Sequence, residues 1–459
     1  MQISHLTHWP KRLFVSIVIA IIGLLSISGG AALAHNSISD SSPAEGEVLA
    51  SPPTLWTITF AKSVPLESAS GQVVTDTGQR QDLPNPRTGT TDNVIVFDFP
   101  QNLTGTITGR WRLVGTDGHV ISGRVTFTAP QATTGALDVT TVAPNGIPAA
   151  PAPAAENIPL PLATEDAAIS ESIRVSTRFV TYVAIILLGG LLFANLYIAQ
   201  GVFSTPRGRR LTYITAIGTL VTPIISLWIL VDDVRGSDGS IGSALSTVHS
   251  LSVSPMIMFR IVAGAAIVFF ARSLLKRKIF DDSGTRLLAL LLTMYCVALA
   301  YGGHSRSLAS PWLGVPTDVI HVIAVSVWLG ALAAVVVVIV PAVSVEQSMI
   351  AFDRFGFAAQ CAVPAIMVTG VIQSLRLHGN VWSVFSSSHG LLLLAKVSVV
   401  VIMLLLGNRN RKFLASRRNA QHRHPKISRA TLMRASIYEA LFGATTIGIT
   451  AVLVAVTPT

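Results

Sequence analysis

The sequence has few cysteines and few charged residues, and both scarcities limit what the protein can be. Its two cysteines, Cys296 and Cys361, lie inside apolar runs, so neither a disulfide framework nor a Cys-X-X-Cys thiolate site can form. Any metal site must therefore use His, Asp, Glu, Met or backbone donors. Charged residues make up 12% of the chain and apolar residues 50%, with a mean hydropathy of +0.59. This composition excludes an ordinary soluble protein and predicts several membrane spans.

Basic residues outnumber acidic ones by 33 to 23. Such an excess can indicate binding to nucleic acid, but here the basic residues are concentrated in a few short loops between apolar segments. That placement is typical of a membrane protein whose cytoplasmic loops set its orientation. We therefore expect a protein embedded in a lipid bilayer, with no nucleic-acid partner.

The first 34 residues have the pattern of a secretory signal peptide. Lys11 and Arg12 precede an apolar core from residue 13 to 27, and the small residues of "AALA" end at Ala34. Cleavage there would make His35 the first residue of the mature chain. The alternative is an uncleaved signal anchor, which the short apolar run and its small, polar exit disfavour.

Residues 35–130 predict a small antiparallel β-sandwich of immunoglobulin-like type. Short alternating runs such as "TLWTITF", "NVIVFDF" and "GRVTFTA" are separated by turns rich in Pro, Gly, Asn and Asp. Residues 131–172 are rich in Ala, Pro and Thr and cannot bury much apolar surface. We expect them to form an extended linker.

Residues 173–459 predict an all-α membrane domain of about eight transmembrane helices. Eight apolar stretches approach or exceed the ~20 residues that a bilayer crossing requires. They lie near 176–202, 211–231, 254–274, 286–303, 317–341, 355–375, 389–407 and 435–456. The most basic loops follow the first, third and seventh stretches. The positive-inside rule therefore places the β-domain and the C-terminus on the outer side of the cell membrane.

The stretch "VGTDGHVISGRVTF" and the start of the mature chain together predict a metal site. Asp117 and His119 are two residues apart, so on a strand both side chains point to the same face. The amine and Nδ1 of an N-terminal His35 can bind one metal ion together. With the Asp117 carboxylate and the His119 imidazole, the site would have three nitrogen ligands and one oxygen ligand. This set suits tetragonal Cu(II), whereas Zn(II) prefers a tetrahedron. Two simpler interpretations stay open: His35 follows Ala34 by chance, and Asp-Gly forms a hairpin turn.

The segments "AHNSISDSSPAEGEVLASPPTLWTITFAKSV" and "WRLVGTDGHVISGRVTFT" resemble the CopC family of copper-binding proteins. The resemblance covers nearly all of residues 35–130. It implies an extracytoplasmic Cu(II) site formed by His35, Asp117 and His119. Residues 35–130 include no methionine. The methionine-rich Cu(I) site of some relatives is therefore absent, since soft thioethers select Cu(I).

Polar residues inside apolar spans are costly and are candidates for function. Asp318, His321 and Trp328 share one helix face, so Asp318 could orient His321 by a hydrogen bond, or simply cap the helix. Met256 and Met258 could each accept Cu(I), although residues two apart on a helix do not face each other. The candidate copper path comprises His304, His321, Asp318, Met256 and Met258, and the candidate buried charge pair is Lys396 with Glu439.

The membrane region resembles the CopD-type copper-resistance membrane proteins. The matching segments include "DVIHVIAVSVWLGAL", "RFGFAAQCAVPAIMVTGV", "LLLLAKVSVVVIMLLLGNRNR" and "EALFGATTIGITAVLVAVTP". The resemblance is closest over residues 300–459 and looser over 175–300. Fused CopC–CopD chains are a known arrangement, and the resemblance implies copper uptake.

These observations predict a copper-transporting membrane protein and not an enzyme. It would capture Cu(II) outside the cell and pass copper to the cytoplasm, as Cu(I) if a reductant acts first. Neither a Walker motif nor an Asp-Lys-Thr-Gly loop is visible, so this chain would not drive transport with ATP. A copper chaperone and a reductase are candidate partners. Two alternatives stay open: a resistance protein that buffers copper without transport, and a redox protein in which His304 and His321 hold haem b.

Overall fold

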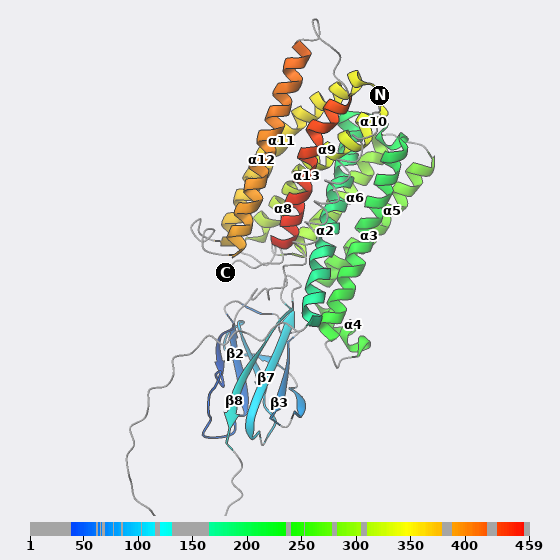
Figure 1. Cartoon of the computed structure of the whole chain (residues 1–459). Coiled ribbons are helices and arrows are strands. Elements are labelled where there is room, and N and C mark those ends of the chain that lie inside the picture. Colours follow the sequence, from blue (N-terminus) through cyan, green and yellow to red (C-terminus); the bar gives the residue numbers. More distant parts are fainter. Residues whose placement is uncertain are drawn as a thin grey trace, which may run out of the picture. The chain divides into compact units, whose positions relative to one another are not determined.

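The chain forms two compact units, a β-domain and a helical domain (Figure 1). The computed structural model describes residues 38–60, 63–64, 66, 69–76, 78–83, 86–101, 103–114, 120–130, 165–235, 240–251, 253–277, 282–303, 310–378, 388–419 and 429–453. The predicted signal peptide and most of the predicted linker lie outside these residues.

The β-domain is a sandwich of two four-stranded sheets, which confirms the predicted fold. One sheet has the order β1 (Ile38–Ser42), β2 (Leu55–Phe60), β6 (Val94–Asp98), β5 (Arg87–Thr88). The other has the order β4 (Arg80–Leu83), β3 (Ser70–Thr75), β7 (Gly105–Val114), β8 (Val120–Ala129). The pairings of β2 with β1 and β6, and of β3 with β4 and β7, are antiparallel.

Aromatic residues from both sheets fill the space between them. Trp56 is fully buried; its ring stacks on Phe99 with centroids 5.9 Å apart and tilts against Phe97 at 5.6 Å. The indole N–H of Trp56 donates to Ser41 Oγ at 3.1 Å, so the polar edge of the ring is satisfied inside the core. Buried and more exposed side chains alternate along β2, so that Trp56, Ile58 and Phe60 all point into the core.

Gly109 on β7 leaves the space that the Trp56 ring occupies. A Cβ at Gly109 would lie 2.8 Å from Trp56 Cη2 and 3.0 Å from Cζ2. We expect Gly109→Ala to lower the free energy of unfolding of the β-domain by about 1–3 kcal/mol, because the core would be overpacked. Guanidinium chloride unfolding of residues 35–130, which have their own hydrophobic core, measures this by tryptophan fluorescence.

A double-mutant cycle controls that experiment. Trp56→Phe removes the ring atoms that a side chain at Gly109 would meet. In this background the alanine substitution should cost clearly less. An equal cost in both backgrounds would show that the clash with Trp56 is not the cause.

The helical domain contains long helices with short connections (Figure 1). They are α2 Glu165–Phe193 with the π-helical turn η2 Ala194–Ile198, the 3-10 turn η3 Val202–Ser204, α3 Pro206–Arg235, α4 Ile241–Ser250, α5 Ser254–Arg277, α6 Asp282–Tyr301, α11 Val345–His378, α12 Ser388–Asn419 and α13 Arg429–Leu453. Between α6 and α11 one rod runs through α8 Pro311–Val325, η4 Ser326–Gly330, α9 Ala331–Ala334, η5 Val335–Ile339 and α10 Val340–Ala342.

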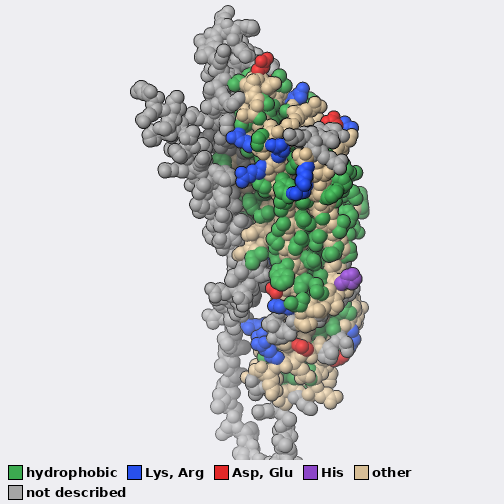
Figure 2. Space-filling model, turned by 90° about the vertical axis from the view of Figure 1, so that its right-hand side faces the viewer, with side chains coloured by type: hydrophobic (Ala, Val, Ile, Leu, Met, Phe, Trp, Pro, Cys, Tyr) green, Lys and Arg blue, Asp and Glu red, His purple; other side chains and the backbone are tan. Residues whose placement is uncertain are grey.

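Seven helical segments of the described chain are long and apolar enough to cross a membrane. Helix α13, the eighth predicted span, has a shorter apolar stretch, Leu441–Leu453. Large apolar side chains point outward, and Val262, Phe269 and Leu405 are each about two-thirds exposed. Figure 2 shows a broad hydrophobic belt across the helices, with Lys and Arg gathered along its upper border. The chain is therefore a multi-pass membrane protein. The short helix α4 was not predicted, since ten residues are too few for a span.

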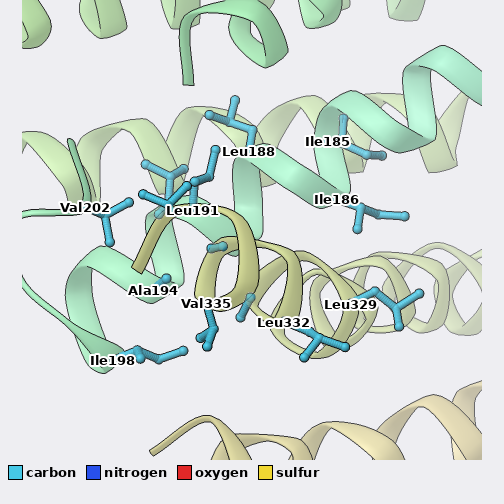
Figure 3. Packing of buried hydrophobic residues seen from close by; sticks show 14 of the residues in the cluster. Ile185, Ile186, Leu188, Leu191, Ala194, Ile198, Val202, Leu329, Leu332 and Val335 are labelled. Atoms are coloured by element: carbon cyan, nitrogen blue, oxygen red, sulfur yellow. The ribbon is translucent and has the colours of Figure 1, made fainter. Parts of the chain in front are cut away.

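The rod from α8 to α10 packs directly on α2 and η2. Figure 3 shows Ile186 and Leu191 of α2 on the side of Leu329, Leu332 and Val335 of the rod, and all five belong to one buried cluster. At the centre of this contact the backbones of Gly190 and Gly330 touch, because neither residue has a side chain to separate them. Small residues at such crossings are what allow membrane helices to pack closely.

Candidate functional site

The described neighbours of the predicted copper ligands lie at one end of the β-domain. Ile38, three residues after His35, pairs with Phe60. The Phe60 ring meets the Trp111 ring edge-on, with centroids 5.0 Å apart. Trp111 lies three residues before Val114, where β7 ends and the segment with Asp117 and His119 begins. The start of β1 and the end of β7 therefore belong to the same end of the sandwich.

The three predicted ligands themselves, His35, Asp117 and His119, lie outside the described residues. The Cu(II) site therefore stays a prediction.

The helical domain contains a cavity of about 700 Å³, within the range of ligand-binding pockets. Its walls come from α2, α3, α5, α6, the α8–η4 segment, α11, α12 and α13. The lining residues lie toward one end of the bundle, where α2, α5, α8 and α12 begin, which we call the α4 end. The cavity thus lies where polar residues inside several different spans meet.

His321 on α8 lines this cavity and has a defined hydrogen-bond partner. Its Nδ1 lies 2.8 Å from Thr369 Oγ1 on α11. The Thr369 hydroxyl donates its single proton to the carbonyl of Ala365 at 2.6 Å. With that proton directed to Ala365, Thr369 Oγ1 is placed to accept from an Nδ1–H of His321, a tautomer with a lone pair on Nε2. A histidine held in this tautomer is ready to bind a metal ion through Nε2.

Asp318, which the sequence suggested could orient His321, has a defined partner on α11. The side chain of Asp318 accepts a hydrogen bond from Gln373 Nε2 at 2.7 Å. The partners Thr369 and Gln373 are four residues apart on α11, so they form one polar face toward α8. This pair was missed, although two polar residues at helical spacing inside the sixth span were visible in the sequence.

Lys396 on α12 lines the same cavity as Asp318 and His321. The side chain of Glu439, its predicted partner, lies outside the described residues, and so does His304. The Lys396–Glu439 pair and the role of His304 therefore stay predictions.

The predicted methionine donors do not contribute to the cavity. Neither Met256 nor Met258 is among its lining residues, and Met258 is about half exposed on the outer face of α5. The sulfur atoms that line it belong to Cys296, Met367 and Met403. Within the described residues no group of three or more His, Cys, Asp or Glu side chains is placed to hold a metal ion. A copper ion here would need ligands in addition to His321.

Arginine is the residue type whose importance in the cavity was underestimated from the sequence. Arg178, Arg260 and Arg376 line it from α2, α5 and α11. Arg376 also donates to the carbonyl of Ser310 at 3.3 Å, and its guanidinium covers Gly314, where any side chain would overlap it. Arg178 lies inside the first predicted span. A charged residue within a span is costly, and this was the sequence signal that could have identified Arg178 as a candidate.

Fold and cavity together define a class of protein: a polytopic membrane protein that carries a separate β-sandwich domain. Family models identify the parts. The CopC domain matches residues 38–130, the N-terminal domain of copper resistance protein D-like proteins matches 169–315, and copper resistance protein D matches 349–453. The chain belongs to the CopC–CopD fusion proteins of the copper-resistance family.

The chain is also similar to individual proteins. The copper transport protein CutJ of Bacillus subtilis (strain 168) is 23% identical over 386 residues, which cover 82% of this chain and 67% of CutJ. CopC from Methylosinus trichosporium OB3b is 22% identical over 22% of this chain and 98% of its own, with a TM-score of 0.20. PcoC, a methionine-rich copper resistance protein from Escherichia coli, is 22% identical over 21% and 99%, with a TM-score of 0.19.

Proposed function

We propose that this protein captures Cu(II) outside the cell through its β-domain and passes copper across the membrane into the cytoplasm. His35, Asp117 and His119 would bind the ion, and His321 would receive copper inside the helical domain. Copper is the cargo of this protein, and a reductase or a chaperone would act before or after it. The proposed orientation, with β-domain and C-terminus outside, follows from the basic loops.

The cavity is the observation that carries the transport proposal. A protein that only displayed a copper-binding domain would need a membrane anchor and nothing more. Here eight helical segments converge on a cavity in which a histidine is held by a hydrogen bond to Thr369. Polar side chains inside a membrane are costly and are retained for function. The relative CutJ, named a copper transport protein, supports the same proposal.

Copper uptake into vesicles tests it. Purified full-length protein is reconstituted into lipid vesicles, and uptake of radioactive copper is compared with that of protein-free vesicles, with Cu(I) and Cu(II) supplied separately. Uptake above the protein-free level supports transport. No uptake of either ion, with Cu(II) still bound by the protein, would favour the buffering alternative.

His321→Gln tests the role of the helical domain. We expect copper uptake to fall about tenfold or more, because the glutamine amide is a much poorer copper ligand than an imidazole nitrogen. Cu(II) binding by the β-domain should not change, since its hydrophobic core is separate. Initial uptake rates in vesicles and Cu(II) titrations of the same preparations measure the two effects.

His249→Gln is the matched control. His249 is an exposed histidine on α4 that does not line the cavity. This variant should transport copper at the native rate. Equal losses in both variants, or no loss in His321→Gln, would remove His321 from the proposed path.

A further inference from the structure

Part of the wall of the cavity in the helical domain is also exposed on the outside of the bundle. Met367 and Val371 on α11 line the cavity, yet each is 58% exposed. Val397 and Val401 on α12 also line it and are 49% and 47% exposed. A side chain can do both only where the cavity reaches the surface. We call these four residues the window, and they place an opening of the cavity between α11 and α12.

The two helices that frame the window pack on different neighbours. Within the described chain α11 packs chiefly on α8, and α12 packs chiefly on α13. The window therefore lies between two packed pairs of helices rather than within one. Beside it, Val368 on α11 and Ile402 on α12 are 60% and 43% exposed and do not line the cavity. The window is thus continuous with the apolar outer surface of the bundle, which faces lipid.

The window lies at the depth of the hydrocarbon core of the bilayer. A helix rises about 1.5 Å per residue, so Val371 and Met367 lie about 9 Å and about 15 Å from Leu377, where the span of α11 ends. Val397 and Val401 lie about 12 Å and about 18 Å from His389, where the span of α12 begins. The hydrocarbon core is about 30 Å thick. What meets the window from outside is therefore lipid acyl chain and not water.

The interior of the cavity becomes more apolar with distance from the α4 end. His321 lies in the polar part, whereas the wall farther along the helices includes Trp328 and Leu329 on the rod and Val400 and Leu404 on α12. Water in an apolar cavity makes few hydrogen bonds, so such cavities do not hold it well. A hydrocarbon chain there would instead be removed from water and gain close packing contacts.

We propose that this cavity is a lipid site, which the acyl chain of a bilayer lipid enters through the window. The chain fills the apolar part of the cavity, against Trp328 and Leu329, and excludes water from it. It also lies close to His321, since a Cβ at Gly370, next to Val371, would be 3.9 Å from His321 Cε1. This site does not depend on copper transport, because it follows from the exposure, the depth and the apolar walls of the cavity.

Phosphatidylcholine with brominated acyl chains tests the lipid site without copper. Bromine quenches tryptophan fluorescence only at contact. Trp328 lines the cavity and is 7% exposed, so lipid that stays outside the bundle does not reach it. Full-length protein is reconstituted into vesicles of brominated or unbrominated phosphatidylcholine, and the emission of Trp328 is the part of the signal lost in Trp328→Phe. We expect this emission to be severalfold weaker in the brominated vesicles.

Larger side chains in the window should reduce this quenching. Val371→Phe narrows the opening from α11 and Val397→Phe narrows it from α12. Each variant should recover most of the Trp328 emission in brominated vesicles. Because both valines are about half exposed, neither change should lower the melting temperature, and this measurement shows that the bundle is still folded.

Val368→Phe is the matched control. Val368 is exposed on α11 like Val371 but does not line the cavity, so this variant should be quenched like the native protein. Equal Trp328 emission in brominated and unbrominated vesicles would overturn the lipid site. Quenching that is the same in Val371→Phe, Val397→Phe and the native protein would overturn entry through the window. Quenching by brominated lipid in a protein that takes up no copper would reject the transport function and leave the lipid site standing.

Discussion

A mature chain that begins with one additional alanine before His35 is expected to bind Cu(II) about 100-fold more weakly than the native chain. The extra residue moves the free amine away from the His35 imidazole, so the two can no longer chelate one ion together. Four-ligand structural zinc sites bind with about 10–16 kcal/mol. One ligand in four is then worth ~3 kcal/mol, which corresponds to ~100-fold in affinity.

The alanine should not disturb the fold of the β-domain. The described part of β1 begins at Ile38, and its pairing with Phe60 lies beyond the insertion. Near-ultraviolet circular dichroism, to which the buried Trp56 and Trp111 contribute, should therefore be unchanged. Cu(II) titration and electron paramagnetic resonance of the two chains measure the difference in binding.

A matched control inserts one alanine into the Ala/Pro/Thr-rich segment 131–172 instead. That chain should bind Cu(II) like the native one, since its N-terminus is unchanged. Native affinity in the chain with the extra N-terminal alanine would show that His35 follows Ala34 by chance. N-terminal sequencing of the mature protein must first establish that cleavage occurs after Ala34.

The features that the sequence predicted well are those set by local periodicity. Alternation of apolar residues in "TLWTITF" is enough to place Trp56, Ile58 and Phe60 in the core of the sandwich. Long apolar runs likewise predicted the helices, because a bilayer crossing requires a minimum length. Neither inference depends on which strands or helices become neighbours in the fold.

The features that were missed depend on which helices pack together. His321 was identified as a functional candidate, but its partner Thr369 is 48 residues away on α11. Gln373, which donates a hydrogen bond to Asp318, is likewise 55 residues away from it on α11. The arginines and the lysine that line the cavity likewise come from four helices, so only the assembled bundle brings them together.

The largest effect on the helical domain is expected from Gly330→Ala. A Cβ at this position would overlap the carbonyl oxygen of Ile186, and a Cβ at Gly190 would overlap the backbone of Gly330. Overpacking typically costs about 1–3 kcal/mol when side chains can move aside. Here backbone meets backbone, so α2 and the rod must separate, and we expect the cost to reach about 3 kcal/mol or more.

Two glycines give graded controls for this prediction. A Cβ at Gly189 would lie 2.9 Å from Ser326 Cβ, a side-chain contact that can partly relax, whereas one at Gly356 on α11 meets nothing within 4 Å. Gly356→Ala should be neutral or stabilising, because alanine favours a helix over glycine by about 1 kcal/mol. Thermal unfolding in detergent is monitored by size-exclusion chromatography. We expect the lowest melting temperature for Gly330→Ala, a higher one for Gly189→Ala and the highest for Gly356→Ala.

This contact also links stability to the cavity. Gly330 ends η4, the π-helical turn that carries Trp328 and Leu329 into the cavity wall. If α2 and the rod separate, that wall moves with them, so any Gly330→Ala protein that still folds should lose copper uptake. A Gly330→Ala protein with native stability and native uptake would show that the two helices can move apart without cost, and that this close approach does not shape the cavity.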